Sequence, residues 1–385
     1  MRKHVVIVSE ESVYAGHYKC GIGEVVDCMA EELRAYYDVT VITIGTGVSG
    51  RIGGRITLGV EGQEFLERAA THVNQICPDL VHNFASPALI DLLQVDCPKV
   101  LTFDRWEEDV AHCLDAVAKY DHVTTLSTAY ANEMIAAHPE AAQWPLKGIL
   151  AGISGHYYLP ADSIWGGDDS NRAKLYRQLG QEDDGKKIIV SMGRLQPVKG
   201  IQDIIDSAQA IHDLGAELVI YGTGLAEYEE QLAALDAAGV LTYYQRMVGY
   251  GEMISVLRGA DFYLMPSLSE VCGLQPMKAA RMGCVPIVRP VGGLWENFDE
   301  STAIPITGTL TDAVAAALAL SESEYAGMKE ACEDGAWTWT TRILPWIELY
   351  GLPTAPPEPK QVQLIHQTPA KPNPPFAKKE DADNE

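Results

Sequence analysis

Short runs of β-branched and other apolar residues recur along the chain, and a stretch with helical periodicity follows each run. Strands that are apolar throughout are typical of parallel sheets covered by helices on both faces. Their alternation with helices predicts a doubly wound α/β fold. The runs form two series, one at residues 4–8, 39–44, 79–84, 99–103 and 122–126, and another at 187–192, 217–221, 261–265 and 285–288.

The two series predict two Rossmann-like domains. A chain of 385 residues is also too long for one core, because domains hold about 150 residues. We expect the first domain over 1–160 and the second over 161–335, because proline and glycine interrupt any regular pattern near 155–169. A closing helix is expected at 336–350. The last residues, 351–385, hold 8 of the 21 prolines and are expected to be a disordered tail.

The charge of the chain argues against several classes of partner. Its 53 acidic residues against 29 Lys and Arg give a formal net charge of -24, and a field of that sign repels nucleic acid and anionic membrane surfaces. No apolar run approaches the roughly 18 residues of a membrane span, and no signal-peptide pattern is present, so we expect a cytoplasmic protein.

The eight cysteines include no Cys-x-x-Cys pair, so neither a zinc site nor a disulfide framework is predicted. No metal and no cofactor are expected.

Two loops that follow predicted strands carry glycines or cations suited to a phosphate. In open α/β sheets, ligands bind at the carboxyl ends of the strands, beside helix N-termini. Lys19, Gly21 and Gly23 lie between the first strand and a long helix, where a plain turn is the alternative. Arg194 and Lys199 share one loop of the second series, and two cations there suit a departing pyrophosphate. Solvated surface cations are the alternative.

Two further loops of the second series add a carboxylate and more glycines. Glu270 follows a strand and precedes Cys272-Gly273-Leu274, where a helix is expected to begin. The carboxylate can accept sugar hydroxyls while the helix N–H groups hold a phosphate, and a plain helix-capping acid is the alternative. In the next strand–helix unit, Gly292 and Gly293 again follow a predicted strand.

In order and spacing, these segments resemble the donor site of GT-B glycosyltransferases, most closely the glycogen and starch synthases. The resemblance rests on Arg194 with Lys199 five positions on, on Glu270 with Cys272-Gly273-Leu274, and on Gly292-Gly293-Leu294. It extends over about residues 1–350 and is strongest in the second half. It implies a GT-B fold with an interdomain cleft. It also implies a retaining transfer of glucose from ADP-glucose or UDP-glucose to an α-glucan, with the first domain on the acceptor side.

The resemblance also implies roles for individual residues. Arg194 and Lys199 would stabilise the leaving diphosphate, and Glu270 would contact the donor sugar. Tyr250 stands where glycogen synthases place an aromatic ring against the base, and a buried packing residue is the alternative. Lys278 stands eight positions after Glu270, where many GT-B transferases have a Glu that binds the ribose. An ammonium has no acceptor, so only a secondary contact with a ribose oxygen or the diphosphate is expected there.

The first half departs from the family pattern at two places. The family's opening Lys-x-Gly-Gly-Leu has either one residue fewer or a displaced lysine here, around Lys19 and Gly21. Asp104 stands where the family has a His after a strand. Two alternatives therefore stay open. One is a GT-B transferase for a small molecule, lipid or protein, and the other is a sugar-nucleotide-binding protein with impaired catalysis.

Overall fold

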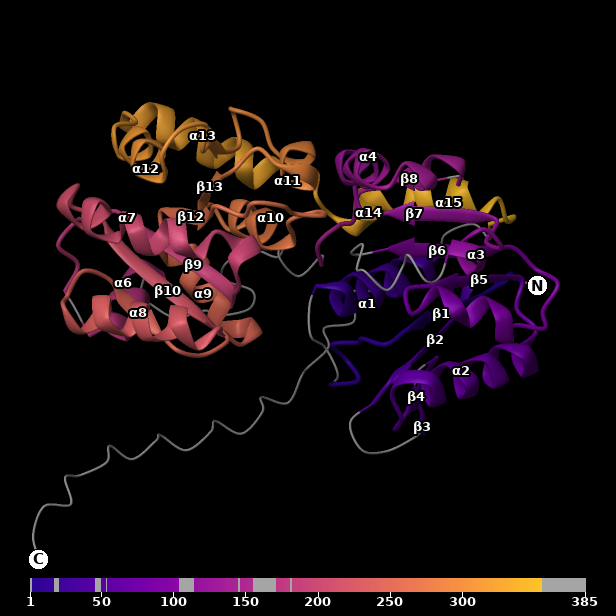
Figure 1. Ribbon diagram of the computed structural model, residues 1–385. Coiled ribbons are helices and arrows are strands. Elements are labelled where there is room, and N and C mark those ends of the chain that lie inside the picture. The colour runs from indigo at the N-terminus through magenta and orange to yellow at the C-terminus, as the bar shows by residue number, and fades with distance from the viewer. Residues whose placement is uncertain are drawn as a thin grey trace, which may run out of the picture.

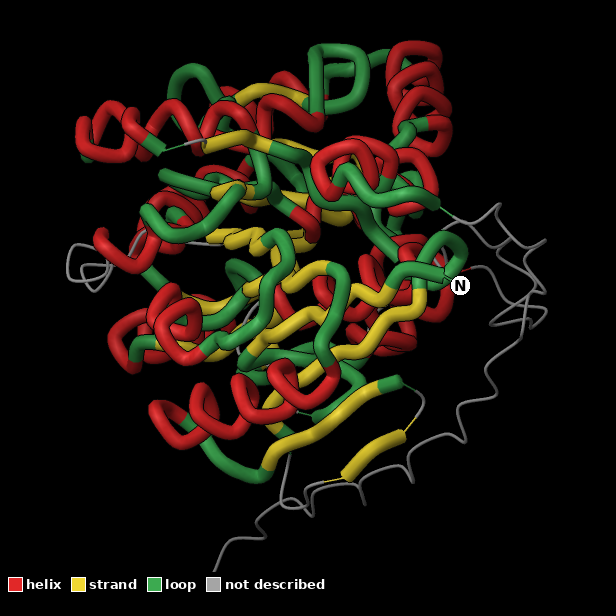
Figure 2. Tube along the Cα trace, turned by 90° about the vertical axis from the view of Figure 1, so that its right-hand side faces the viewer, coloured by secondary structure: helices red, strands yellow, loops and turns green. Residues whose placement is uncertain are grey.

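The computed structural model describes residues 2–16, 21–45, 50–52, 54–103, 114–144, 146–154, 171–180 and 182–354. Within this part of the chain there are two mainly parallel sheets, each flanked by helices (Figures 1 and 2). The predicted pair of doubly wound α/β units is confirmed. Lys19, Asp104 and almost the whole predicted tail lie outside the described residues.

The first sheet has eight strands in the order β3-β4-β2-β1-β5-β6-β7-β8. Only β3 and β4 pair antiparallel. The sequence pattern does not predict β3, β4 or β8, because Gly-Arg-Ile, Arg-Ile-Thr-Leu and Leu-Lys-Gly are short and not apolar throughout. The strands are β1 (His4–Ser9), β2 (Asp38–Ile44), β3 (Gly50–Ile52), β4 (Arg55–Leu58), β5 (Leu80–Asn83), β6 (Lys99–Phe103), β7 (His122–Thr125) and β8 (Leu146–Gly148).

Helices pack on this sheet through apolar stripes at helical spacing. In α1 (Ile22–Leu33) the stripe includes Val26, Met29 and Leu33, which are fully buried. Burial of such a face stabilises a helix more than its intrinsic propensity does. The other helical segments here are α2 (Gly62–Ile76), η1 (Pro87–Leu92), α3 (Leu114–Val117), α4 (Thr128–Ala137) and η3 (Pro139–Gln143).

The second sheet has six parallel strands in the order β11-β10-β9-β12-β13-β14. They are β9 (Ile188–Leu195), β10 (Glu217–Gly224), β11 (Thr242–Tyr244), β12 (Phe262–Met265), β13 (Val285–Val288) and β14 (Ile304–Pro305). Its helical segments are α6 (Asn171–Leu179), η5 (Pro197–Lys199), α7 (Ile201–Asp213), α8 (Ala226–Ala237), α9 (Tyr250–Gly259), α10 (Leu274–Arg281), α11 (Gly292–Asn297), α12 (Leu310–Leu318) and α13 (Glu322–Asp334). The strand order reverses between β9 and β12, which is where ligands bind in open α/β sheets.

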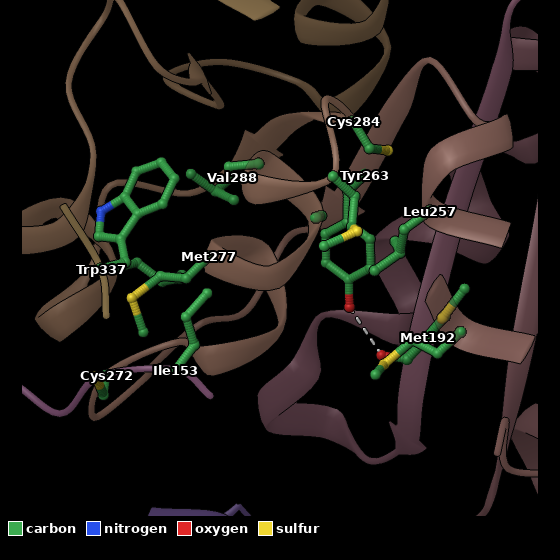
Figure 3. Packing of buried hydrophobic residues seen from close by; sticks show 14 of the residues in the cluster. Ile153, Met192, Leu257, Tyr263, Cys272, Met277, Cys284, Val288 and Trp337 are labelled. Atoms are coloured by element: carbon green, nitrogen blue, oxygen red, sulfur yellow. Dashed lines mark hydrogen bonds between the residues drawn. The ribbon is translucent and has the colours of Figure 1, made fainter. Parts of the chain in front are cut away.

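The core of the second sheet joins its central strands through one buried polar contact. The hydroxyl of Tyr263 on β12 donates to the Met192 carbonyl on β9 at 3.0 Å, among apolar side chains that include Met277 and Trp337 (Figure 3). A buried hydroxyl must find such a partner because leaving it unpaired costs about 1–3 kcal/mol. The contact fixes β12 against β9, the two strands that flank the strand-order reversal.

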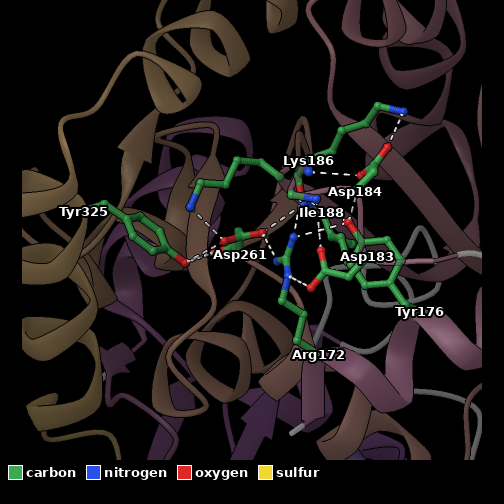
Figure 4. Close-up of polar contacts among 10 residues, drawn as sticks. Arg172, Tyr176, Asp183, Asp184, Lys186, Ile188, Asp261 and Tyr325 are labelled. Carbon is green, nitrogen blue, oxygen red and sulfur yellow. Dashed lines mark hydrogen bonds and ion pairs between the residues drawn. The ribbon is translucent and has the colours of Figure 1, made fainter.

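A polar network holds the opposite, amino edge of the same strands. The Asp261 carboxylate, just before β12, accepts from the Ile188 backbone N–H at 2.9 Å and pairs with Arg172 at 2.9 Å (Figure 4). Lys187 adds a second ion pair at 3.0 Å. These contacts lie at the end of the strands remote from the carboxyl edge, so they fix α6 and the sheet and leave the ligand edge free.

The chain crosses between the two sheets in paired segments. Ile153 donates its N–H to the Trp337 carbonyl at 2.8 Å and accepts from the Trp339 N–H at 3.3 Å. The segment after the crossing forms two short helices, α14 (Trp339–Arg342) and α15 (Leu344–Tyr350), where the sequence predicts one. Pro345 explains the break, since it lacks an N–H and sits in the first turn of α15. Both helices return to the first sheet (Figure 1).

Candidate active site

Three loops meet at the carboxyl edge of the second sheet. They follow β9, β12 and β13, and parallel strands bring their carboxyl ends to the same edge. The Leu268 N–H donates to the Val198 carbonyl at 2.8 Å and joins the first two loops. Gly200, with φ +68°, lies so close to the Pro266 carbonyl that a Cβ there would be 2.2 Å from its oxygen. Only glycine permits this approach of the two loops.

The structure brings two of the predicted catalytic residues into direct contact. The Lys199 ammonium forms an ion pair with the Glu270 carboxylate, and the two side chains are 26% and 15% exposed. Arg194, partly buried at the end of β9, has no ion-pair partner among the described residues. The edge therefore combines the Lys199–Glu270 ion pair with Arg194, a cation that could meet an anion.

Gly292 and Gly293 hold the loop that carries Glu270. The Gly293 N–H donates to the Glu270 carbonyl at 2.9 Å. Gly292, with φ +46°, lies where a Cβ would be 2.2 Å from that same oxygen. The pair therefore packs α11 directly on the Glu270 backbone, and the Gly293 amide is already used within the protein. Contact of the two glycines with substrate stays a prediction.

The Cys272-Gly273-Leu274 segment turns the chain into α10. The Cys272 thiol points into the core, 4.0 Å from the Ala151 carbonyl, and burial raises its pKa to about 11. It is therefore protonated, and contact of Cys272 with substrate stays a prediction. Gly273 adopts φ +80° as the N-cap, and no side chain caps the helix. The first N–H groups of α10 consequently lack a side-chain acceptor at the helix start.

The first domain approaches this site through the start of α1. A Cβ on Gly21 would lie 3.0 Å from the Leu274 side chain, so the two helix starts face each other across the domains. Lys278, 5% exposed, forms an ion pair with Glu24, 23% exposed. Its ammonium therefore points to the first domain in this structure. Gly23 lies buried within the first turn of α1.

Lys19 and Asp104 lie outside the described residues. Tyr250 begins α9, but its side chain lies outside the described part of the structure. The roles implied for these three residues stay predictions.

Sequence reasoning missed several residues that shape the site. Arg289, just after β13, donates to the Asp203 carboxylate in the first turn of α7 at 2.6 Å and to the Pro266 carbonyl in the β12 loop at 3.4 Å. Asn297, in α11, donates to the Cys272 carbonyl at 2.5 Å and accepts from Arg342 at 2.7 Å. The sequence could have indicated Arg289, because it is a cation directly after a predicted strand. No local sequence pattern indicates a role for Asn297.

Two classes of feature are absent from the described residues. Within these ranges no group of three or more His, Cys, Asp or Glu side chains is arranged to hold a metal ion. In the same part of the chain, no helix has the length and apolar character needed to cross a membrane.

Comparison with known proteins identifies the part of the chain that carries this site. Residues 173–325 match the family described as Glycosyl transferases group 1. The chain is 30% identical to a glycogen synthase of Fusobacterium nucleatum over 227 residues, which are 55% of this chain and 48% of that protein. It is 27% identical to a glycogen synthase of Xanthomonas axonopodis pv. citri over 262 residues, 61% of this chain and 54% of that one. The chain thus spans about half the length of these curated relatives.

Solved structures share the fold over most of the chain. The catalytic domain of starch synthase IV from Arabidopsis thaliana, bound to ADP and acarbose, aligns with a TM-score of 0.74 at 17% identity and covers 91% of this chain and 99% of its own. HepE from Anabaena, in complex with UDP and glucose, aligns with a TM-score of 0.68 at 14% identity, covering 91% and 99%. The fold is therefore GT-B. Within it, residues 173–325 match the glycosyl transferases group 1 family, and the predicted resemblance to the glycogen and starch synthases is confirmed.

Proposed function

We propose that the protein is a retaining glycosyltransferase that moves glucose from ADP-glucose or UDP-glucose to an α-glucan. The observation that carries this proposal is the Lys199–Glu270 ion pair at the strand-order reversal of a GT-B fold, on the sheet edge where Arg194 lies at the end of β9. The sequence relatives are glycogen synthases, and the structural neighbours bind ADP with acarbose, or UDP with glucose.

The charges at this edge suit a leaving diphosphate. Arg194 and the Lys199 ammonium would bind its oxygens as negative charge develops, through charge-assisted hydrogen bonds in a partly buried site. Lys199 would then be shared between the phosphate and Glu270. The carboxylate, held through its own backbone by Gly293, would accept hydroxyls of the transferred sugar. The uncapped start of α10 would add backbone N–H groups to the same anion.

Glu24 changes the role proposed for Lys278. The ion pair between them joins the two domains beside the facing starts of α1 and α10. Lys278 would therefore fix the first domain against the donor loop, and any contact with the ribose would require it to leave Glu24. Gly21 and Gly23 would bring the α1 backbone close to the donor, with Lys19 and Asp104 as further substrate contacts.

A second candidate is a transferase for a smaller acceptor. Val198 and Leu268 beside the Lys199–Glu270 pair are 41% and 54% exposed, which presents an apolar rim to the acceptor. Such a rim fits a molecule with an apolar portion as well as the apolar face of a sugar ring.

The test is a screen of nucleotide sugars for release of nucleoside diphosphate, with and without glycogen. Release from ADP-glucose or UDP-glucose that depends on glycogen, with an α-linked product in NMR spectra, is the expected result. Release that requires a small-molecule, lipid or protein acceptor would favour the second candidate. Binding of nucleotide sugars without turnover on any acceptor would contradict both and favour a binding protein.

A further inference from the structure

Glu296 lies at the far end of α11 and contacts the first domain. Its carboxylate accepts the Thr128 N–H at 3.0 Å and also the Ala129 N–H. These are the first two amides of α4. The third, at Tyr130, donates to the Ser127 side chain at 3.1 Å. A residue of the second domain thus completes the cap of a helix in the first.

The other end of α11 lies against the same helix. The Glu133 carboxylate, one turn into α4, is 3.5 Å from the position that a Cβ on Gly292 would take. Glu296 and Gly292 therefore place both ends of α11 along α4. Since the Gly293 N–H in the first turn of α11 donates to the Glu270 carbonyl, a continuous path of contacts runs from α4 to Glu270.

The carboxylate is chemically required for this contact. Its two oxygens accept from two adjacent amides, and its negative charge lies at the positive end of the α4 dipole. A glutamine has the same size but only one acceptor oxygen, and its NH₂ group would face the second amide. Replacing Glu296 by Gln therefore removes one hydrogen bond and places an NH₂ group against the second backbone N–H. It opens no cavity, because the two side chains have the same size.

We propose that Glu296 is a positioning residue for the transfer reaction. It docks α11 on α4, and through Gly293 this docking fixes Glu270 relative to the acceptor-side domain. The inference rests on the proposed function for its catalytic consequence. The docking itself is independent of any substrate. The cations and the α10 start proposed to bind the diphosphate lie in the second domain and do not contact Glu296, so we expect nucleotide affinity to depend little on this residue.

The experiment compares Glu296→Gln with the wild-type chain, with Glu300→Gln as the matched control. Glu300 is exposed four positions on and undergoes the same chemical change. Hydrogen exchange of peptides that contain Thr128, Ala129 and Gly293 reports the docking directly. Titration with ADP and UDP reports nucleotide affinity, and kcat at saturating donor reports the positioning.

Glu296→Gln should speed exchange at the α4 start and at Gly293 and lower kcat by about tenfold or more, since small misplacements cost that much. The nucleoside diphosphate Kd should stay within about twofold, because the helix N-termini and cations that bind it are untouched. Glu296→Asp should restore part of the kcat, and Glu300→Gln should match the wild type.

Three outcomes would overturn the proposal. Unchanged exchange at α4 would mean that the contact is not formed in solution. Faster exchange with unchanged kcat would remove the positioning role, and a parallel loss of nucleotide affinity would indicate a general structural defect. If the wild type turns over no nucleotide sugar while the exchange results hold, the proposed function fails and the docking of α11 on α4 stands.

Discussion

Buried His82 makes the first domain less stable at acid pH. It lies on β5 with no exposed surface, and its ring nitrogens bond the Tyr350 hydroxyl at 2.7 Å and the Thr102 hydroxyl at 2.6 Å. Thr102 continues the chain to the Thr124 hydroxyl at 2.6 Å. Burial alone lowers the pKa of His82 from 6.5 to about 3. The imidazole is therefore neutral in the folded protein.

The direction of the effect follows from the lowered pKa. Between pH 6.5 and about pH 3, His82 is protonated in the unfolded chain but stays neutral in the folded chain. The contribution of this histidine to stability is thus complete above pH 6.5 and falls as the pH drops toward about 3. At about pH 5 the loss is roughly 2 kcal/mol, from about 1.5 pH units at 1.36 kcal/mol each.

The assay is urea unfolding at about pH 7 and pH 5, followed by tryptophan fluorescence. Trp346 is a local reporter, with its ring centroid 5.3 Å from that of His82. Other groups also titrate in this range. The informative quantity is therefore the loss of unfolding free energy between the two pH values, compared between wild type and His82→Gln. The variant should be less stable at neutral pH but should lose about 2 kcal/mol less than the wild type on acidification.

Thr102→Val is the matched control. It removes a hydrogen-bond partner of the ring but keeps the histidine buried, so it should lower stability at both pH values and retain the wild-type pH dependence. If His82→Gln and the wild type lose the same stability between the two pH values, the reasoning about the buried neutral imidazole is refuted.

Three further predictions concern the proposed site. Arg194→Ala and Lys199→Ala should each cut kcat on the order of 100-fold, because each removes a contact that strengthens as the diphosphate leaves; near-normal turnover in steady-state assays would count against that role. Glu270→Gln should lose most turnover while calorimetry still detects nucleoside diphosphate binding, and an active variant would exclude it from the chemistry. Lys278→Ala leaves the Glu24 carboxylate unpaired and should cost about 3 kcal/mol in urea unfolding and raise the apparent donor KM. The double variant with Glu24→Ala should regain part of that stability, and simple additivity would show that the ion pair is not formed.

The sequence predicts this fold well where strands are runs of apolar residues. The strands β9, β12 and β13 are apolar runs, and parallel pairing then places their following loops at one edge. The meeting of Lys199 and Glu270, which lie 71 positions apart, follows from that topology. The two-residue β14 has no pattern of its own and depends on its neighbour β13.

Contacts between the domains are the part that the sequence could not supply. Glu24 and Glu296 are ordinary acidic residues on helices, and their partners lie 254 and 167–168 positions away. For Glu296 the partners are backbone amides, which every residue but proline has, so residue identity carries no signal. The break between α14 and α15 could have been predicted from the sequence, because Pro345 disfavours a continuous helix.

The return of α15 to the first sheet has a consequence for synthesis of the chain on the ribosome. Trp346 and Tyr350 cover His82, so the face around β5 stays uncovered until these residues have been made. The nearly 200 residues between Ile153 and Tyr350 take about 10–40 s to translate at about 5–20 residues per second. For that interval the nascent first domain exposes apolar surface, and it is a natural client for chaperones that bind emerging chains.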